Sequence, residues 1–326
     1  MTAPQPALEA AASPDEPGDP LPPRADARIR VIWNAAAGSK GGISTNSIDD
    51  VGLRRLMVRG RLGDELVATT SPQEACEQAR DAVAREYDLV VAVGGDGTVG
   101  LIATELLMTR TALGILPFGS VMNIARSLGI PRDPAAAADA IATGRVVNMD
   151  VGEVNGRPFF EAGSIGLNAA MFREAQRFDD GDWSSIARTL WVALRYRPAR
   201  MSIELESGEI RTRALMVTVS NGPYAGAGMT VAPHARLDDG RFDVRVFRRF
   251  SKPRLLRHLV SIAFGRYRYA PEVDTYRSRF VRIRSAHPLP ARADSRDLGS
   301  TPVEFTTRRG ALRVVVPAPL TAVDRP

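Results

Sequence analysis

The segment from Tyr87 to Gly100, YDLVVAVGGDGTVG, joins an apolar run to three glycines that surround one aspartate. The run from Leu89 to Val93 is typical of a short strand that is covered on both faces of a parallel sheet. Gly94, Gly95 and Gly97 then let the backbone turn sharply and approach a ligand closely. Such a turn directs several N–H groups toward one point, which suits a phosphate group.

Asp96 and Thr98 give this loop its reactive groups. The carboxylate of Asp96 could hold a metal ion or accept a proton, and we expect Asp96 to be catalytic. Thr98 could cap an apolar helix that begins there and ends near Thr109. The alternative is a plain tight turn between a strand and a helix, because a glycine-rich loop alone is weak evidence.

Two further loops follow apolar strands in the same half of the chain. The segment Asn34 to Gly42, NAAAGSKGG, follows RVIWN, and the segment Gly119 to Pro131, GSVMNIARSLGIP, follows ALGILPF. Three such loops at one sheet edge favour a shared nucleotide pocket over coincidence. The chain contains no G-x-x-x-x-G-K-[ST] sequence, which argues against a P-loop fold.

The elements that must position these loops alternate between strand and helix from residue 28 to about residue 150. We expect strands at 28–34, 64–69, 87–94 and 112–118, and helices at 48–60 and 71–86, which predicts an α/β layer with a mostly parallel sheet. Ligands of such sheets lie at the carboxyl ends of the strands. After residue 151 the pattern becomes largely β, which predicts a mostly antiparallel, β-sandwich-like second domain.

The charge distribution and the lengths of the apolar runs limit which partners and which cellular environment the protein can have. The 326 residues carry a formal net charge of +6, although the first 23 residues contain seven prolines, four acidic residues and no Lys or Arg. We therefore expect a disordered tail over residues 1–26 and an excess of positive charge on the folded part, which favours an anionic partner. No apolar run approaches the length of a membrane span.

The order of these motifs resembles the diacylglycerol kinase catalytic-domain family, which includes bacterial lipid kinases and is related to the sphingosine kinases. The matching segments are GGDGT, LPFGSVMNIARSLGIP, FFEAGSIGLNA, VSNGPYAGAGMTVAPHARLDDGRFDV and TPVEFTTRRGALRVVVP. The resemblance implies an NAD kinase-like α/β nucleotide-binding domain over residues 27–150 and a β-sandwich lipid-binding domain over residues 151–317, followed by a tail over 318–326.

The resemblance also implies an activity and its cofactors. The family transfers the γ-phosphoryl group of ATP to a lipid hydroxyl, diacylglycerol-like or sphingoid, in the cleft between the two domains, with Mg²⁺ as the metal ion. Such a reaction belongs to phospholipid biosynthesis. The nucleotide contacts of the family fall on Asn34, Ala35, Ala36, Ala37, Gly38, Thr69 or its neighbour Thr70, Gly94, Gly95, Gly97, Thr98 and Ser120.

The segment HARLDDGRFDV resembles the cation loop of the family. Asp239 would supply a carboxylate, with the carbonyl groups of Arg236 and Arg241 beside it, which suits an oxygen-seeking cation such as Mg²⁺. An ordinary hairpin turn is the alternative, because hairpins favour the Asp-Gly dipeptide.

Two motifs depart from the family pattern without changing its order. The family commonly places an Asn and often a Glu just after GGDGT, where this chain has Gly100 and Leu101. The family sequence GTxND becomes GSVMN, so that Met122 takes the Asn position and Asn123 takes the Asp position.

A third departure concerns the general base. The DGE of the family, whose Glu is its expected base, aligns with DSR, so that Arg296 stands where the base is expected. Arginine cannot accept a proton at neutral pH. Asp297 and Asp294 are the nearest carboxylates along the chain, and we favour Asp297 slightly because the family already has an Asp at the position of Asp294.

The segment from Arg245 to Arg284 contains twelve Lys or Arg residues and only two acidic residues. This pattern predicts either a solvated basic face or a surface that docks on anionic lipid headgroups. We expect a cytoplasmic kinase on the inner face of the membrane, with a lipid substrate and no nucleic acid as partner, and a homodimer is compatible with the sequence. Two alternatives stay open: a weak or inactive relative, and a soluble-substrate kinase like the NAD kinases, which share GGDG.

Overall fold

The structure is a computed structural model that describes residues 27–35, 39–40, 43–44, 48–179, 188–189, 191–192, 195–226, 228–248 and 273–318. Several sequence predictions lie outside these residues: the tails at 1–26 and 319–326, the contacts of Ala36, Ala37 and Gly38, and the part of the basic segment from 249 to 272. None of the helices in the described part of the chain has the length and apolar character that crossing a bilayer requires.

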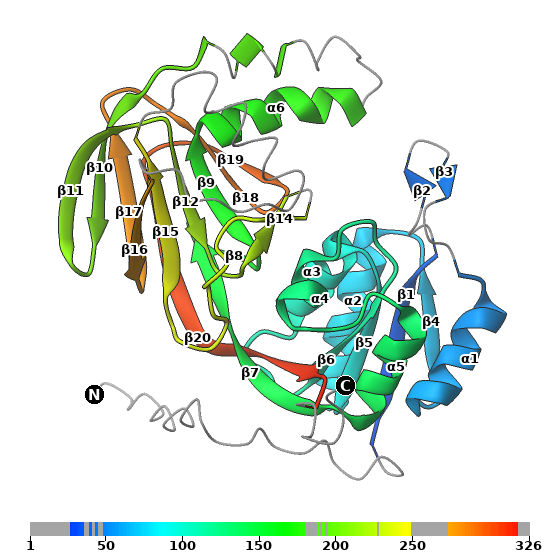
Figure 1. The fold of residues 1–326 in the computed structure, drawn as a ribbon. Helices are drawn as coiled ribbons and strands as arrows, with labels where there is room; N and C mark the ends of the chain where they lie inside the picture. Colours follow the sequence, from blue (N-terminus) through cyan, green and yellow to red (C-terminus); the bar gives the residue numbers. More distant parts are fainter. Residues whose placement is uncertain are drawn as a thin grey trace, which may run out of the picture.

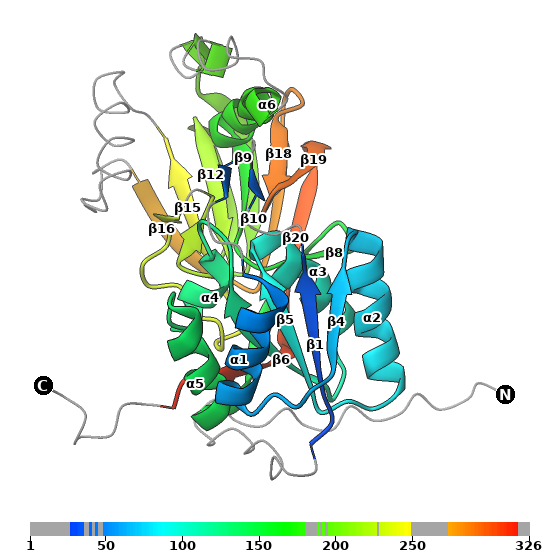
Figure 2. The ribbon, with the colours of Figure 1, turned by 90° about the vertical axis from the view of Figure 1, so that its right-hand side faces the viewer.

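The first half is an α/β layer, as the sequence predicts. Its parallel strands run in the order β6-β5-β1-β4. In Figure 2, α1 and α5 lie to one side of these strands and α2 to the other. The elements are β1 (Ile29–Asn34), β2 (Ser39–Lys40), β3 (Ile43–Ser44), α1 (Asp50–Gly60), β4 (Leu66–Thr69), α2 (Pro72–Ala84), β5 (Leu89–Gly94), α3 (Asp96–Glu105), β6 (Ala112–Pro117), α4 (Asn123–Ser127) and α5 (Pro134–Thr143).

Local sequence explains where these elements begin. Every residue of β5 and of β6 is buried, as the unbroken apolar runs indicate. Asp49, Ser71 and Asp133 cap α1, α2 and α5, each through a side-chain oxygen that accepts a backbone N–H of the first turn. The first residue of α2 and of α5 is a proline, whose ring presets the helical φ angle.

The helix after the glycine loop differs from the sequence prediction. It begins at Asp96 with Gly95 as its N-cap, and it ends at Glu105 rather than near Thr109. Thr98 is therefore not the cap but a buried residue of the first turn. The side chain of Thr98 packs where a Cβ atom on Gly94 would lie, 2.8 Å from the Thr98 Oγ1, so Gly94 makes room for it.

The second half contains two layers of sheet with a shared core, which confirms the predicted sandwich. Its elements are β7 (Arg145–Val154), β8 (Arg157–Phe159), β9 (Ala162–Gly166), α6 (Leu167–Asp179), β10 (Ala199–Leu205), β11 (Gly208–Ala214), β12 (Met216–Ser220), β13 (Tyr224–Ala225), β14 (Met229–Thr230), β15 (Phe242–Phe247), β16 (Val273–Ser278), β17 (Phe280–Ser285), β18 (Pro290–Ala293), β19 (Arg296–Ser300) and β20 (Val303–Val316). One sheet has the order β16-β15-β12-β9-β18-β19, and the other begins with β11-β10-β17-β20.

Three phenylalanines fill the space between the two layers. Phe159 stacks on Phe242 and meets Phe305 edge-on, with ring centroids 5.7 Å apart in both pairs. All three side chains are fully buried. Gly163 lies against this cluster, since a Cβ atom there would come within 2.3 Å of the Phe305 ring.

The long strands β7 and β20 connect the two halves. They pair antiparallel along most of their length, and the end of β20 also pairs parallel with β6 through Val314 and Leu113. A single ten-stranded sheet therefore runs from β11 in the second half to β4 in the first. Figure 1 shows β7 and β20 passing between the sandwich and the α/β layer. Asp150, the last residue of the first domain as predicted from sequence, lies inside β7.

Candidate active site

The glycine loop between β5 and α3 presents the start of a helix without a side-chain cap. Gly95 is the N-cap and has no side chain to accept the first-turn N–H groups of Asp96, Gly97 and Thr98. Gly97 is exposed, and a Cβ atom there would meet nothing within 4 Å. Open space in front of unsatisfied N–H groups at a helix N-terminus suits an anion, so this loop fits a nucleotide phosphate.

The loop after β6 packs directly on the glycine loop. A Cβ atom on Gly119 would come within 2.6 Å of the Gly95 Cα, so only glycine allows this approach. The N–H of Phe118 donates to the Gly94 carbonyl at 3.0 Å, and the N–H of Ile124 donates to Asp96 Oδ1 at 3.0 Å. The two loops therefore form one surface, and the Asp96 carboxylate is fixed by the start of α4.

The end of β1 joins the same surface. Asn34 Nδ2 donates to Thr98 Oγ1 at 3.1 Å, and the N–H of Ala35 donates to the Thr69 carbonyl at 3.2 Å. Ser120 is exposed in the loop after β6, where its carbonyl accepts a hydrogen bond from Arg132. The structure thus gathers the described nucleotide-contact candidates at the carboxyl edge of the parallel strands.

Glu161, between β8 and β9, brings a carboxylate of the second half to this surface. Its Oε2 accepts hydrogen bonds from Asn123 Nδ2 at 2.8 Å and from the N–H of Gly226 at 3.1 Å. Burial, followed by the negative charges of Asp294 and Asp96, raises the pKa of Glu161 to about 8. Glu161 is therefore mostly protonated at pH 7 and able to exchange a proton near neutral pH.

Asp294 holds the backbone of Glu161 in place. It sits in the turn between β18 and β19 with a positive φ of 48°, and its two carboxylate oxygens accept the N–H groups of Phe160 and Glu161, each at 2.9 Å. Burial raises the pKa of Asp294 above its usual range, although these N–H groups oppose the shift. Arg292 lies beside the two acids, and burial lowers its pKa to about 10, which leaves it charged at neutral pH.

Helix α4 connects the first half to the loop between β13 and β14. Asn123 Nδ2 donates to the Gly226 carbonyl at 2.8 Å, and Arg126 Nη1 donates to the Gly228 carbonyl at 3.0 Å. The guanidinium of Arg126 also stacks on the Tyr224 ring, 4.0 Å from its centroid. These contacts hold Glu161 opposite the glycine loop. A small cavity of about 30 Å³ borders Glu161 and Asp294, with room for about one water molecule.

Comparison with known proteins matches both halves of the chain to described families. The family model described as diacylglycerol kinase catalytic domain matches residues 28–154, and the model described as YegS C-terminal NAD kinase beta sandwich-like domain matches residues 163–316. The chain belongs to the diacylglycerol kinase catalytic-domain family. It is therefore a member of a kinase family, and its relatives carry the names of diacylglycerol and lipid kinases.

Relatives match over most of the chain. A diacylglycerol kinase of Bacillus subtilis (strain 168) is 28% identical over 256 residues, which are 77% of this chain and 84% of the relative. A probable lipid kinase YegS-like of Chromohalobacter salexigens is 29% identical and covers 73% of this chain and 79% of the relative. The fold matches the crystal structure of a putative diacylglycerol kinase from Bacillus anthracis str. Sterne, with a TM-score of 0.68, 21% identity, and coverage of 89% of this chain and 97% of that one.

Both residues of the GSVMN departure, Met122 and Asn123, have a structural counterpart. Met122, at the position of the family Asn, adopts left-handed backbone angles, φ 57° and ψ 48°, and its buried side chain packs against the glycine loops. Asn123, at the position of the family Asp, is a neutral donor to Glu161. A neutral amide at this position can donate a hydrogen bond to the carboxylate, whereas an ionised Asp would repel it.

The structure does not bring Asp297 to this cluster. Asp297 lies in β19, where the guanidinium of Arg173 binds it at 2.6 Å and the N–H of Gly299 donates to it at 2.8 Å. The Arg173 guanidinium holds the pKa of Asp297 below its usual range. Arg296 donates to the Pro158 carbonyl. Glu161 is therefore a better candidate for the base than Asp297, and Asp294 acts on Glu161 through its backbone.

The suggested cation loop carries ion pairs in this structure. Asp239 accepts a hydrogen bond from Arg277 and another from the N–H of Arg241 at 2.9 Å. Arg236 binds Asp238 through two hydrogen bonds, at 2.8 and 3.0 Å. The described residues contain no group of three or more His, Cys, Asp or Glu that could hold a metal ion. The Mg²⁺ assignment to Asp239, Arg236 and Arg241 stays a prediction, and Arg277 would have to move for a cation to bind Asp239.

Sequence reasoning missed Glu161 although the segment FFEAGSIGLNA was in view. The available signal was a single carboxylate, Glu161, directly after two phenylalanines and before a run of small and apolar residues, where an unpaired charge would be costly. That signal marks a buried acid, but it does not reveal the partners that Glu161 finds on α4 and on the β13–β14 loop.

Proposed function

We propose that this protein is a lipid kinase that transfers the γ-phosphoryl group of ATP to a lipid hydroxyl between its two halves. The observation that supports this most directly is the position of Glu161. A buried acid with a pKa of about 8 from the second half is held, through Asn123, against the loop of the first half that fits a phosphate. A proton acceptor beside a phosphate site is the arrangement that phosphoryl transfer to a hydroxyl needs.

The first half binds and orients the nucleotide. The N–H groups of Gly97 and Thr98 at the start of α3 direct partial positive charge at the transferred phosphoryl oxygens. Asn34 fixes the Thr98 hydroxyl, and Gly119 allows the second loop to close against Gly95. A bound Mg²⁺ would neutralise phosphate charge, and ATP would bring this ion with it.

Glu161 takes the proton of the attacking hydroxyl. As the hydroxyl oxygen forms its bond to the γ-phosphorus and the bond to the leaving oxygen of ADP breaks, the hydroxyl proton passes to the Glu161 carboxylate. Asp294 keeps Glu161 in position through the two backbone N–H groups that it accepts. Asn123 donates to the Glu161 carboxylate and thereby stabilises its ionised form, because the pKa of Glu161 would be higher without this hydrogen bond.

The reaction can be tested with labelled ATP. We expect transfer of label to at least one lipid in a panel of diacylglycerols and sphingoid bases, and no transfer in lipid-free reactions or with soluble acceptors such as NAD. Asp96→Asn should abolish transfer with the fold retained. Transfer only to a soluble acceptor would instead place the protein with the soluble-substrate kinases.

Arg296 supports one alternative, a relative that has lost catalysis. If the family base position were indispensable, wild type would phosphorylate no lipid and Arg296→Glu would gain activity. The contact of Arg296 with the Pro158 carbonyl and the presence of Glu161 favour an active enzyme instead. We further propose that the protein acts at an anionic membrane surface, where its lipid substrate resides.

A further inference from the structure

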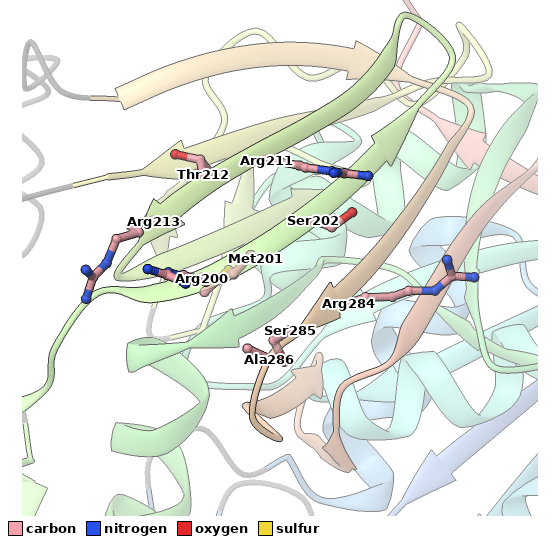
Figure 3. A pocket seen from close by; sticks show the side chains of 9 residues that line it. All are labelled: Arg200, Met201, Ser202, Arg211, Thr212, Arg213, Arg284, Ser285 and Ala286. Atoms are coloured by element: carbon pink, nitrogen blue, oxygen red, sulfur yellow. The ribbon is translucent and has the colours of Figure 1, made fainter.

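The outer face of β10, β11 and β17 carries a groove of about 520 Å³ that belongs to no part of the candidate active site. Figure 3 shows the side chains that line it. Its charged residues are all arginines, and all are exposed: Arg200, Arg211, Arg213 and Arg284. Ser202 lies between them on the same face, and its hydroxyl donates to Glu209, whereas Thr212 and Ser285 line the groove from the alternate strand positions opposite Met201.

The strand register places like charges opposite one another. Arg200 of β10 pairs directly with Arg213 of β11, and Ser202 pairs with Arg211 on one side and Arg284 on the other. Like charges in directly opposite positions destabilise a sheet.

The next row of the same sheet face holds three carboxylates and one arginine, with Glu209 of β11 directly opposite Glu204 of β10. Arg282 of β17 lies between Glu204 and Glu304 and binds them at 2.9 and 3.0 Å. Glu209 of this neighbouring row binds Arg211 of the groove at 3.0 Å, and the Arg213 guanidinium donates to the Pro198 carbonyl at 3.4 Å. Four guanidinium groups with one bound carboxylate leave the groove positively charged.

The arginines stand at both ends of the groove. In Figure 3, Arg200 and Arg213 extend to the left of Ser202, and Arg211 and Arg284 extend to the right. Guanidinium groups match the geometry of phosphate oxygens. The volume lies in the range of small-ligand sites.

We propose that this groove is a phosphate-binding site that is separate from the nucleotide site. The phosphate can come from the headgroup of an anionic phospholipid or from a free phosphorylated molecule, and both present the same oxygens to the arginines. The inference goes beyond the proposed kinase activity and does not depend on it, because the groove shares no residue with the Glu161 cluster.

The experiment uses the full chain and two charge-matched double variants. Arg200→Gln/Arg213→Gln removes two groove cations. Arg55→Gln/Arg157→Gln removes two exposed cations from α1 and β8 and serves as the control. Binding is measured by sedimentation with phosphatidylcholine vesicles that contain or lack phosphatidylglycerol, and by the shift of the thermal midpoint with inorganic pyrophosphate.

We expect the groove variant to bind phosphatidylglycerol vesicles roughly thirtyfold more weakly than wild type, with the control variant within about threefold. This result identifies a lipid headgroup as the source of the phosphate. A pyrophosphate shift that shrinks in the groove variant but not in the control, without vesicle binding, identifies a free phosphate. The shift that remains in the groove variant then belongs to the nucleotide loop.

Two results would overturn the proposal. In the first, both variants lose vesicle binding equally and keep equal pyrophosphate shifts. In the second, wild type binds neither probe more tightly than the groove variant does. The groove variant should melt no earlier than wild type, because it relieves the opposed charges of Arg200 and Arg213. If the double variant does not fold, Arg284→Gln on β17 tests the same site with one substitution, with Arg55→Gln as its control.

Discussion

Glu161 is the side chain on which the proposed phosphoryl transfer depends most. Glu161→Gln keeps the size of the side chain but cannot accept a proton, so we expect turnover on the lipid substrate to fall by about 10² to 10⁴-fold with nucleotide affinity preserved. Asp297→Asn is the matched control, because Arg173 already binds that carboxylate away from the site. Equal losses of turnover in both variants would indicate that the base lies in the β18–β19 region instead.

The pH dependence of turnover provides a separate test of Glu161. Only the ionised carboxylate accepts a proton, and its pKa lies at about 8. The turnover of wild type should therefore rise as the pH increases through about 8, and Glu161→Gln should lack this rise in its residual activity. A wild-type profile that is flat from pH 6 to 9 would argue against Glu161 as the base.

The free energy of unfolding should also depend on the ionisation of Glu161. It should fall as the pH increases, whereas turnover should rise. The unfolded chain releases the proton of Glu161 near the ordinary value of 4.5, whereas the folded chain keeps it until about 8. Between these values the folded state binds more protons, so this group lowers the free energy of unfolding as the pH rises. Relative to Glu161→Gln, wild type should lose on the order of a few kcal/mol between pH 5 and 9 in urea denaturation. Parallel curves for the two proteins would mean that Glu161 is ionised throughout.

At the scale of elements, the contact between the two glycine loops determines how β5 and β6 present the nucleotide site. Gly119→Ala places a methyl group 2.6 Å from the Gly95 Cα and 2.7 Å from Met122 Sδ, so the loops must move apart. We expect the KM for ATP to rise about tenfold or more, because misplaced loops lose contacts that orient the phosphates. Steady-state kinetics at saturating lipid measures this change.

Gly100→Ala in α3 is the matched control for that loop variant. Its new methyl group would lie at an ordinary contact distance of 3.7 Å from the Phe160 ring. Alanine in a helix interior gains up to about 1 kcal/mol over glycine, so stability should hold or rise with the KM for ATP unchanged. A similar rise of KM in both variants would show that α3 as a whole is sensitive, rather than the contact between the loops.

At the scale of the whole molecule, β20 belongs to both halves. It pairs with β17 in the sandwich, with β7 along most of its length, and with β6 of the parallel strands. A fragment of residues 27–154 would therefore leave β6 and β7 with unpaired backbone groups and exposed apolar faces. We expect this fragment to aggregate alone and to become soluble when residues 155–318 are produced with it. A fragment that is monomeric and cooperative in thermal unfolding would show that the first half folds without β20.

Sequence patterns that act locally predicted the strands and loops of the first half well. The strand expected at 87–94 is β5, Leu89–Gly94, and the helix expected at 71–86 is α2, Pro72–Ala84. Burial on both faces requires an unbroken apolar run, and a cap requires a particular residue at one position. Thr98 shows the limit of such rules, because its hydroxyl looked like a cap and is instead buried beside Gly94.

By itself the sequence determined the kind of fold and predicted the sheet edge at which the candidate nucleotide loops meet, because strand periodicity and glycine turns are encoded in neighbouring residues. Only the tertiary structure brings Glu161 to the candidate site, since its backbone partner Asp294 is 133 positions away along the chain. The arginine groove has the same origin, because Arg200, Arg213 and Arg284 meet only through the register of three strands. A pKa or a charge cluster depends on distances in space, and these arise when segments far apart in sequence pack together.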